Sequence, residues 1–351
     1  MKHLAAALLF ALPIVAQQPQ PAPFGEKLDV NLVLIDAIVT DNKGSQILGL
    51  EKDDFVVKEN GVAQPIDTVD YFTNRRLLNA PEQSAPFKVE RVSEARYFVV
   101  FFDKPEDGQL FDQLALARST VRDFIKDRLQ PGDQVAVVGH DVRLKVYSDF
   151  TSDKKQLLAA VEESARFGTG TLEAPKSEGA SILRGASRSQ IMSRTGTVYE
   201  ALDVLGDTLR PIRGRKNVIL FSPGIVEPGE TVEGGVVINR SRYYEPMIHS
   251  LNASNVAVYP VQLQRNLAGG DVPAIHQTLE GLAAETSGEY FRYNTSFAPA
   301  LRKIEQKNNG YYLISYYSHH PKGTTGYQRV QLATKSRELR VQSREGYVYG
   351  E

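Results

Sequence analysis

Carboxylates gather immediately after one apolar run of the sequence. Asp103 ends the run Tyr97–Phe102, and Glu106 and Asp107 follow within the next few residues. Hard divalent cations such as Mg²⁺ and Mn²⁺ prefer oxygen ligands of this kind. One candidate function is therefore a metal-assisted hydrolase that holds a divalent ion with Asp103, Glu106 and Asp107. A solvated acidic loop that binds no metal is the simpler interpretation of the same residues.

Other residues that could carry chemistry have ordinary structural interpretations. His140 and Asp141 follow an apolar run and could form an acid–base pair, but a capped strand end explains them more simply. His319 and His320 could form a metal or proton-transfer pair, but neighbouring residues of a strand point to opposite faces, so we interpret them as a surface loop pair. Ser222 lacks the Gly-x-Ser-x-Gly context of a nucleophile elbow. Because no nucleophile, base and orienting group can be assembled, we expect the chain not to be an enzyme.

Length and composition exclude several classes of protein. A chain of 351 residues is long enough for two domains, and 42% hydrophobic with 24% charged residues is typical of globular proteins. The 41 Lys and Arg residues against 42 Asp and Glu residues give a net charge of −1, which disfavours a nucleic-acid partner bound by bulk basic charge. The absence of cysteine excludes disulfide frameworks, thiolate zinc sites and cysteine nucleophiles.

The start of the chain has the pattern of a signal peptide. Lys2 and His3 precede the apolar run Leu4–Ala16, and a Gln- and Pro-rich segment follows. The run is shorter than the ~20 apolar residues that span a bilayer. We therefore expect residues 1–16 to be removed and the mature chain, without a membrane span, to be periplasmic or secreted.

Two kinds of hydrophobic periodicity divide the rest of the chain. In the first part apolar residues such as Val30, Leu32 and Leu34 alternate, and Asn60-Gly61 is a strong hairpin signal. From residue 96 onward, apolar runs alternate with helical patterns, which predicts a doubly wound, mostly parallel α/β sheet. Period-two alternation returns after Gly310.

These patterns predict a chain with an inserted α/β domain. Chain ends often lie close together, so the first and last β segments are expected to form one β-sandwich; two separate small β units are the alternative. The predicted divisions are a signal peptide (1–16), a linker (17–26), an N-terminal β module (27–75), a linker (76–95), an α/β domain (96–309) and C-terminal β strands (310–351).

Several segments, in order, resemble the von Willebrand factor A domain. More narrowly, the chain resembles the VWFA-related proteins exported by acidobacteria and similar bacteria, over roughly residues 27 to 348. The matching segments are Asp53-Asp54-Phe55 with Glu59-Asn60-Gly61, Tyr97–Asp103, Leu129–Val137, Phe150–Asp153, Tyr199–Leu202, Arg215–Ser222, Leu282–Gly288, Tyr311–Tyr316 and Arg344–Tyr347. The resemblance implies a Rossmann-type sheet with a binding site at its C-terminal edge.

The family's metal site is eroded in this sequence. Its pattern is Asp-x-Ser-x-Ser, then a Thr, then an Asp. Asp103 matches the first Asp, whereas Pro105 and Asp107 occupy the two Ser positions, Gly196 the Thr position and Pro223 the last Asp position. No cofactor is certain, and the resemblance implies only Mg²⁺ or Mn²⁺ as a candidate. The candidate ligands are Asp103, Asp107, Thr195 and Thr197.

The predicted function is that of an exported, non-catalytic protein-binding (adhesion or scaffold-like) protein. Its A-type domain would present loops 104–109, 167–195 and 223–240 to a protein or extracellular ligand, with Asp103 at the centre. The candidate contact residues are Glu106, Gly108, Ser222 and Gly224. Besides the metal-assisted hydrolase, a structural subunit of an envelope assembly that uses unpaired β edges is an alternative.

Overall fold

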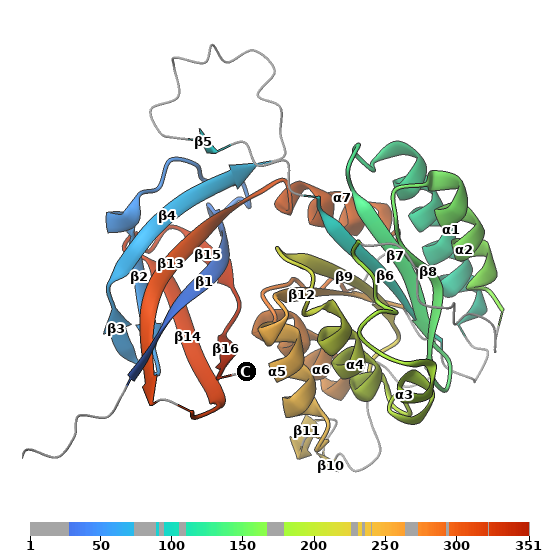
Figure 1. Ribbon diagram of the computed structural model, residues 1–351. Helices are drawn as coiled ribbons and strands as arrows, with labels where there is room; N and C mark the ends of the chain where they lie inside the picture. The colour runs from blue at the N-terminus through green and yellow to red at the C-terminus, as the bar shows by residue number, and fades with distance from the viewer. Residues whose placement is uncertain are drawn as a thin grey trace, which may run out of the picture.

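The computed structural model describes most of the chain from Leu28 onward. The described residues are 28–73, 89–90, 95–104, 110–166, 179–225, 231–233, 236–239, 241–263, 273–292, 295–321 and 323–350. The expected signal peptide and first linker, with Pro105, Glu106, Asp107 and Gly108, lie outside these residues. Figure 1 shows an antiparallel β part beside an α/β part. Within the described residues, no helix has the length and apolarity needed to cross a membrane.

The α/β part is built on a five-stranded sheet of order β12-β9-β6-β7-β8. Its strands are β6 (Tyr97–Asp103), β7 (Gln134–His140), β8 (Leu144–Thr151), β9 (Lys216–Ser222) and β12 (Val256–Gln262). All pairs are parallel except β7 with β8. The apolar runs form strands here because both faces of the sheet are buried. The chain moves outward from β6 to β8, then returns to β9 and β12, so its direction switches between β6 and β9.

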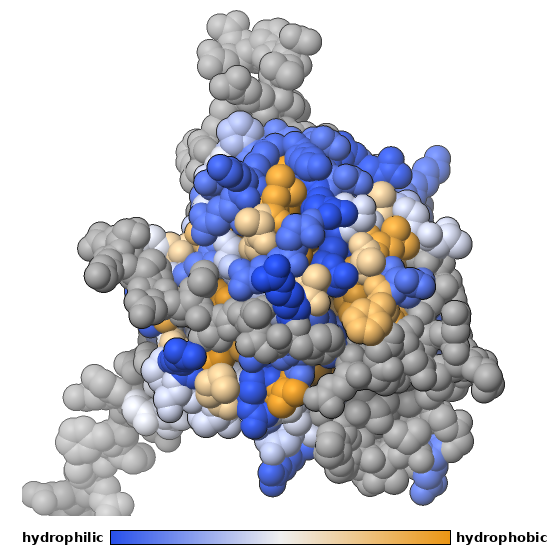
Figure 2. All heavy atoms as spheres, turned by 90° about the vertical axis from the view of Figure 1, so that its right-hand side faces the viewer, coloured by the Kyte–Doolittle hydropathy of each residue, from blue (hydrophilic) through white to orange (hydrophobic). Residues whose placement is uncertain are grey.

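Helices cover both faces of this sheet. One face carries α1 (Phe111–Asp127), α2 (Lys154–Glu163) and α7 (Ala298–Lys307), which pack on one apolar cluster. The other carries α3 (Arg188–Ser193), α4 (Val198–Leu209), α5 (Tyr244–Ala253) and α6 (Pro273–Glu285), which pack on a second cluster. The prediction of a mixed α/β fold with a mostly parallel sheet is confirmed. Figure 2, which faces the α1–α2 side, shows mainly hydrophilic residues with small, separated apolar patches.

The β part contains two sheets that share one core, and all their strand pairs are antiparallel except β4 with β5. Their orders are β15-β1-β13-β4-β5 and β16-β14-β2-β3. The strands are β1 (Leu28–Thr40), β2 (Phe55–Glu59), β3 (Val62–Gln64), β4 (Ile66–Thr73), β5 (Val89–Glu90), β13 (Gly310–Pro321), β14 (Gly326–Thr334), β15 (Arg340–Ser343) and β16 (Gly346–Tyr349). A 3₁₀ turn, η1 (Lys52–Asp54), precedes β2. β13 pairs with β1 and β4, and β14 pairs with β2, so strands from both ends of the chain share each sheet.

Local sequence explains some of these elements and misleads at others. Asn60 and Gly61 both have positive φ, as a tight hairpin turn requires, and they join β2 to β3. The loop expected at 223–240 contains an antiparallel ribbon of β10 (Thr231–Glu233) and β11 (Val236–Asn239). The interpretation of His319 and His320 as a loop pair is wrong: both lie on β13, and His320 is buried.

The β part packs against the N-terminal ends of the parallel strands. Asn255, just before β12, donates a hydrogen bond to Asp36 of β1. Arg344, between β15 and β16, donates to the carbonyl oxygen of Asn252 at 2.9 Å. Gln342 donates to the carbonyl oxygen of Gly288 at 2.9 Å. These contacts leave the C-terminal ends of β6, β7, β9 and β12 at the other edge of the sheet.

Candidate functional site

Polar side chains end the four parallel strands at that C-terminal edge. His140 ends β7, Asp103 ends β6, Ser222 ends β9 and Gln262 ends β12, and all four side chains are buried. On each strand, every second residue packs toward α4, α5 and α6, and the residue of the edge row continues that series. The residues of the series include Val138 on β7, Phe101 on β6, Leu220 on β9 and Val258 on β12. Successive side chains of a strand point to opposite faces, so these four point to the same face. We call them the edge row.

Asp103 and Ser222 are joined across the point where the chain direction switches. Ser222 Oγ donates a hydrogen bond to Asp103 Oδ2 at 2.6 Å, and the backbone N–H of Gly224 donates to Ser222 Oγ at 3.1 Å. A hydrogen bond to a carboxylate is stronger than one between neutral groups, so it holds the Asp103 side chain in one orientation. Open α/β sheets bind ligands in the crevice at such a switch.

His140 is held by the loop that precedes α4. Its Nε2 lies 3.1 Å from the carbonyl oxygen of Thr195, which can only accept, so Nε2 carries the proton. Burial is the main cause that lowers the pKa of His140, which keeps the imidazole neutral near pH 7. Asp141 instead pairs with Lys104 at 3.3 Å and with Lys145 at 4.0 Å. The interpretation of His140-Asp141 as a strand end fits this geometry.

Lys104 is a buried cation that directly follows Asp103 in the sequence. Besides its ion pair with Asp141, its Nζ donates to Tyr147 Oη at 2.6 Å and to the carbonyl oxygen of Ser164 at 3.2 Å. Burial is the main cause that lowers the pKa of Lys104, and attraction to Asp141 acts against it. These bonds tie the end of β6 to β8 and to the end of α2.

Gln262 supplies an acceptor without a hydrogen-bond partner. The residue is 8% exposed, and its buried Oε1 accepts no hydrogen bond from the residues that the structure describes. Gln262 pairs in register with Ser222, so it lies beside the Asp103–Ser222 pair. An unsatisfied buried acceptor costs about 1–3 kcal/mol, so this amide at the end of β12 is an unusual polar group at the C-terminal edge.

The two threonines proposed as metal ligands are engaged elsewhere. Thr195 Oγ1 donates to the carbonyl oxygen of Ile191 at 2.5 Å and accepts from the backbone N–H of Leu144 at 3.0 Å. Thr197 is the N-cap of α4, where its hydroxyl accepts from the Glu200 N–H at 3.1 Å. As arranged, both hydroxyls therefore fit a metal site poorly. Among the described residues, no group of three or more His, Asp or Glu side chains is placed to hold a metal ion.

The remaining predicted site residues divide into two groups. Ser222 and Gly224 lie at the C-terminal edge, with Pro223 buried between them, and Ser222 belongs to the edge row. Glu106, Asp107, Gly108 and Pro105 lie outside the described residues. Sequence reasoning did not place His140 and Gln262 in this site. The signal that could have found them is their position as the last residues of predicted parallel strands.

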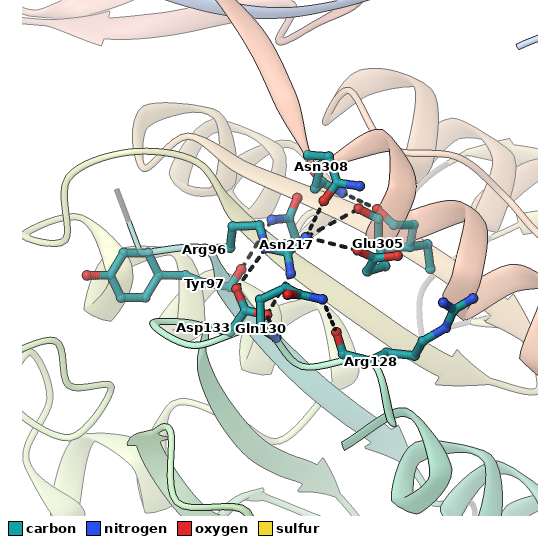
Figure 3. A network of polar contacts seen from close by, with 10 residues as sticks. Arg96, Tyr97, Arg128, Gln130, Asp133, Asn217, Glu305 and Asn308 are labelled. Carbon is teal, nitrogen blue, oxygen red and sulfur yellow. Dashed lines mark hydrogen bonds and ion pairs between the residues drawn. The ribbon is translucent and has the colours of Figure 1, made fainter. Parts of the chain in front are cut away.

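A second buried polar network lies at the opposite edge of the sheet (Figure 3). Arg96 donates to both carboxylate oxygens of Asp133 at 2.7 and 2.6 Å and lies 3.3 Å from Glu305 Oε1. Burial alone would lower the pKa of Arg96, but the hydrogen bonds and charges of Asp133 and Glu305 raise it. The network fastens the start of β6 to the turn before β7 and to α7, so we assign it a structural role.

Comparisons with known proteins give distant structural likenesses. No family model matches the chain, and no curated protein matches it. BatB from Bacteroides thetaiotaomicron is 15% identical with a TM-score of 0.39, over 61% of this chain and 97% of that one. An aerotolerance-related membrane protein from Bacteroides fragilis is 14% identical with a TM-score of 0.38, over 61% and 98%. The PilB minor pilin from Streptococcus sanguinis is 11% identical with a TM-score of 0.39, over 82% and 80%. These values assign the chain to no family.

Proposed function

We propose that this chain is an exported, non-catalytic protein that binds a protein partner through the C-terminal edge of its α/β sheet. The edge row lies at the centre of the proposed binding site. The single observation that carries the proposal is the Asp103 carboxylate, which Ser222 fixes at the strand switch. A partner suited to this edge presents hydrogen-bond donors or positive charge toward the Asp103 carboxylate.

The hydrogen bonds of the edge row favour binding over catalysis. The Ser222 proton is directed to Asp103, and the proton-bearing nitrogen of His140 faces a backbone carbonyl oxygen. A catalytic serine donates its proton to a base, and a third group orients that base. In the edge row, Ser222 donates to a carboxylate instead, and the proton-bearing nitrogen of His140 is bound to the carbonyl oxygen of Thr195. Groups held in fixed hydrogen bonds instead give this end of the sheet a rigid polar arrangement with one carboxylate.

The topology supports an A-type, Rossmann-like fold for the α/β part. The first strand, β6, is central, the chain moves outward on both sides of it, and the antiparallel β8 forms one edge. The β part packs against the N-terminal ends of the strands, so the C-terminal edge faces away from it (Figure 1). This arrangement suits a module that presents one end of the sheet. Export rests on the signal-peptide pattern of residues 1–16.

We further propose that partner binding needs no divalent ion. In the family, Mg²⁺ or Mn²⁺ bridges the site to a carboxylate of the partner. Here Asp103 could supply one oxygen ligand, but Thr195 and Thr197 are engaged in local hydrogen bonds and Pro223 has no carboxylate. The edge row therefore works through Asp103 itself, and the metal-assisted hydrolase is the less supported alternative.

Partner capture tests the proposal. Immobilised protein is exposed to culture supernatant and periplasmic extract, with and without EDTA. We expect the wild type to retain a partner that Asp103→Asn and Gln262→Leu lose, while EDTA has no effect. Arg122→Gln, on an exposed part of α1, is the matched control and should retain the partner. Unchanged capture by folded Asp103→Asn and Gln262→Leu proteins refutes the edge row as the binding site.

A further inference from the structure

The outer face of the β part exposes an apolar stripe of Leu32, Leu34 and Tyr317. Leu32 and Leu34 on β1 are 52% and 44% exposed, and Tyr317 on β13 is 46% exposed. Tyr317 lies directly opposite Leu32 in the antiparallel ladder. The residues that follow each leucine on β1, Val33 and Ile35, are buried in the core. Contiguous exposed apolar residues on a sheet face mark an interaction surface.

The strand that carries this stripe also has an unpaired edge. β13 pairs with β1 from Leu28 to Ala37, whereas β15 pairs with the other side of β1 only from Ala37 to Thr40. Among the described strands, none pairs with this side of β1 before Ala37. The edge is open because the chain leaves β15 at Arg344 and continues as β16, which pairs with β14 in the other sheet.

The orientation of the backbone at this edge follows from one hydrogen bond. Arg344 Nη2 donates to the carbonyl oxygen of Leu34 at 2.5 Å, so this carbonyl points away from β13. The N–H and C=O groups of one residue point to the same edge, and the edge alternates along the strand. The backbone groups of Leu32 and Val30 therefore also point to the open edge. An edge of this kind is a template for another strand.

We propose that the open edge of β1 pairs with β1 of a second copy of this chain, antiparallel about a twofold axis at Asn31. Two identical edges meet in such a contact, so each must be complementary to itself. β1 meets this condition. Val30 of one copy lies opposite Leu32 of the other, and both direct their backbone groups across the new interface. The two apolar stripes then lie side by side on one face.

Charge and length agree with this pairing. With Asn31 on the axis, Asp29 of one copy lies opposite Val33 of the other, so no like charges face each other directly. The carbonyl oxygen of Leu34 is already bound by Arg344, so the pairing ends near Val33. The interface lies on the β part and uses no residue of the edge row. Its failure would therefore leave the proposed function standing.

A cysteine-free chain allows a direct test. Asn31→Cys introduces the only thiol, and Asn31 is exposed. Directly opposite, non-hydrogen-bonded residues have Cβ atoms about 4.5–5.5 Å apart, close enough for a disulfide after a small adjustment. We expect mild oxidation to convert Asn31→Cys protein into a cross-linked dimer. Val62→Cys is the matched control, because Val62 is 65% exposed on β3 at a different edge.

Sedimentation velocity on the wild type and on Leu32→Lys completes the test. The wild type should form dimers as its concentration rises, and Leu32→Lys should weaken the dimer at least about tenfold, because a lysine on an edge strand opposes pairing. Thermal melting confirms that the variant is folded. A wild type that stays monomeric at the highest concentration reached overturns the proposal. Cross-linking of Asn31→Cys no faster than Val62→Cys does so too.

Discussion

Lys216 is a buried cation at the junction of the two parts of the molecule, and its charge makes stability depend on pH. The residue is 2% exposed, and its Nζ donates to the carbonyl oxygen of Ile212 at 2.7 Å. Burial lowers the pKa of Lys216 from 10.5 to about 8; attraction to Asp36 raises it and repulsion from Arg344 lowers it further. The folded protein therefore releases this proton at a lower pH than the unfolded chain.

The sign and size of the effect follow from this shift. Because the folded pKa lies below the unfolded pKa, the unfolded chain binds more protons between pH 8 and 10.5. The free energy of unfolding therefore rises with pH through this interval. At 1.36 kcal/mol for each pKa unit, the full penalty below pH 8 is about 3 kcal/mol. It is nearly absent above pH 10.5.

Lys216→Met is the perturbation, because methionine fills similar space without the charge. Urea unfolding of both proteins at pH 7 and pH 10 gives the difference in unfolding free energy at each pH. From pH 7 to pH 10, the unfolding free energy of the wild type should rise relative to that of Lys216→Met by roughly 2–3 kcal/mol. Burial also raises the pKa of Tyr147, Tyr316 and Tyr347, but these groups are present in both proteins and cancel. A difference that stays constant from pH 7 to pH 10 refutes the reasoning.

Further predictions concern the polar network, one glycine and ions. Arg96→Met should lower the unfolding free energy by about 3–5 kcal/mol, because Asp133 and Glu305 stay buried without their cation. Urea unfolding measures this loss, and a loss of unfolding free energy below about 1 kcal/mol would contradict the structural role of the network. Gly288→Ala should strongly lower the melting temperature, because the new Cβ would lie 1.7 Å from the carbonyl oxygen of Val258, and a wild-type melting curve would be inconsistent with this packing. Added Mg²⁺ or Mn²⁺ should leave the melting temperature of the wild type unchanged, and a rise would indicate a bound ion.

Much of the α/β part is predictable because its strands are buried on both faces. The run Tyr97–Phe102 is apolar at every position, and only a central strand of a covered sheet places such a run out of water. Asp103 stands out for the same reason, since it is the first charge after that run. Gln262 does not stand out. Its importance depends on its register with Ser222 and on the lack of a donor to its Oε1 among the described residues, and both are tertiary properties.

The phase of β1 could not be predicted from the sequence. Leu32, Val33, Leu34 and Ile35 are apolar in succession, so either face could be the buried one. Packing against Tyr312, Tyr316 and their neighbours selects Val33 and Ile35 for the core and leaves Leu32 and Leu34 outside.

The burial of His320 was equally hidden. His320 Nε2 lies 3.0 Å from Ser318 Oγ and 3.1 Å from Tyr347 Oη. Both hydroxyls donate their protons to the Glu59 carboxylate, so they accept from His320. These partners lie on β2, β13 and β16, so residues far apart in the sequence make this polar cluster possible. A histidine that is surrounded by hydrogen-bonding groups can be buried at little cost, whereas the same residue alone would favour the surface.

The two proposed contacts lie on different parts of the molecule, and the junction between them decides how they act together. Asp36, Arg344 and Gln342 of the β part each form a hydrogen bond with the α/β part. Their partners are Asn255, Asn252 and Gly288, respectively. These bonds fix the edge row relative to β1. A dimer joined through β1 therefore presents two edge rows at a set separation. Two linked sites that engage one surface bind it far more tightly than one site does, provided that the geometry allows both to engage. If both proposals hold, weak single contacts at each edge row are sufficient for firm attachment to a partner with repeated binding sites.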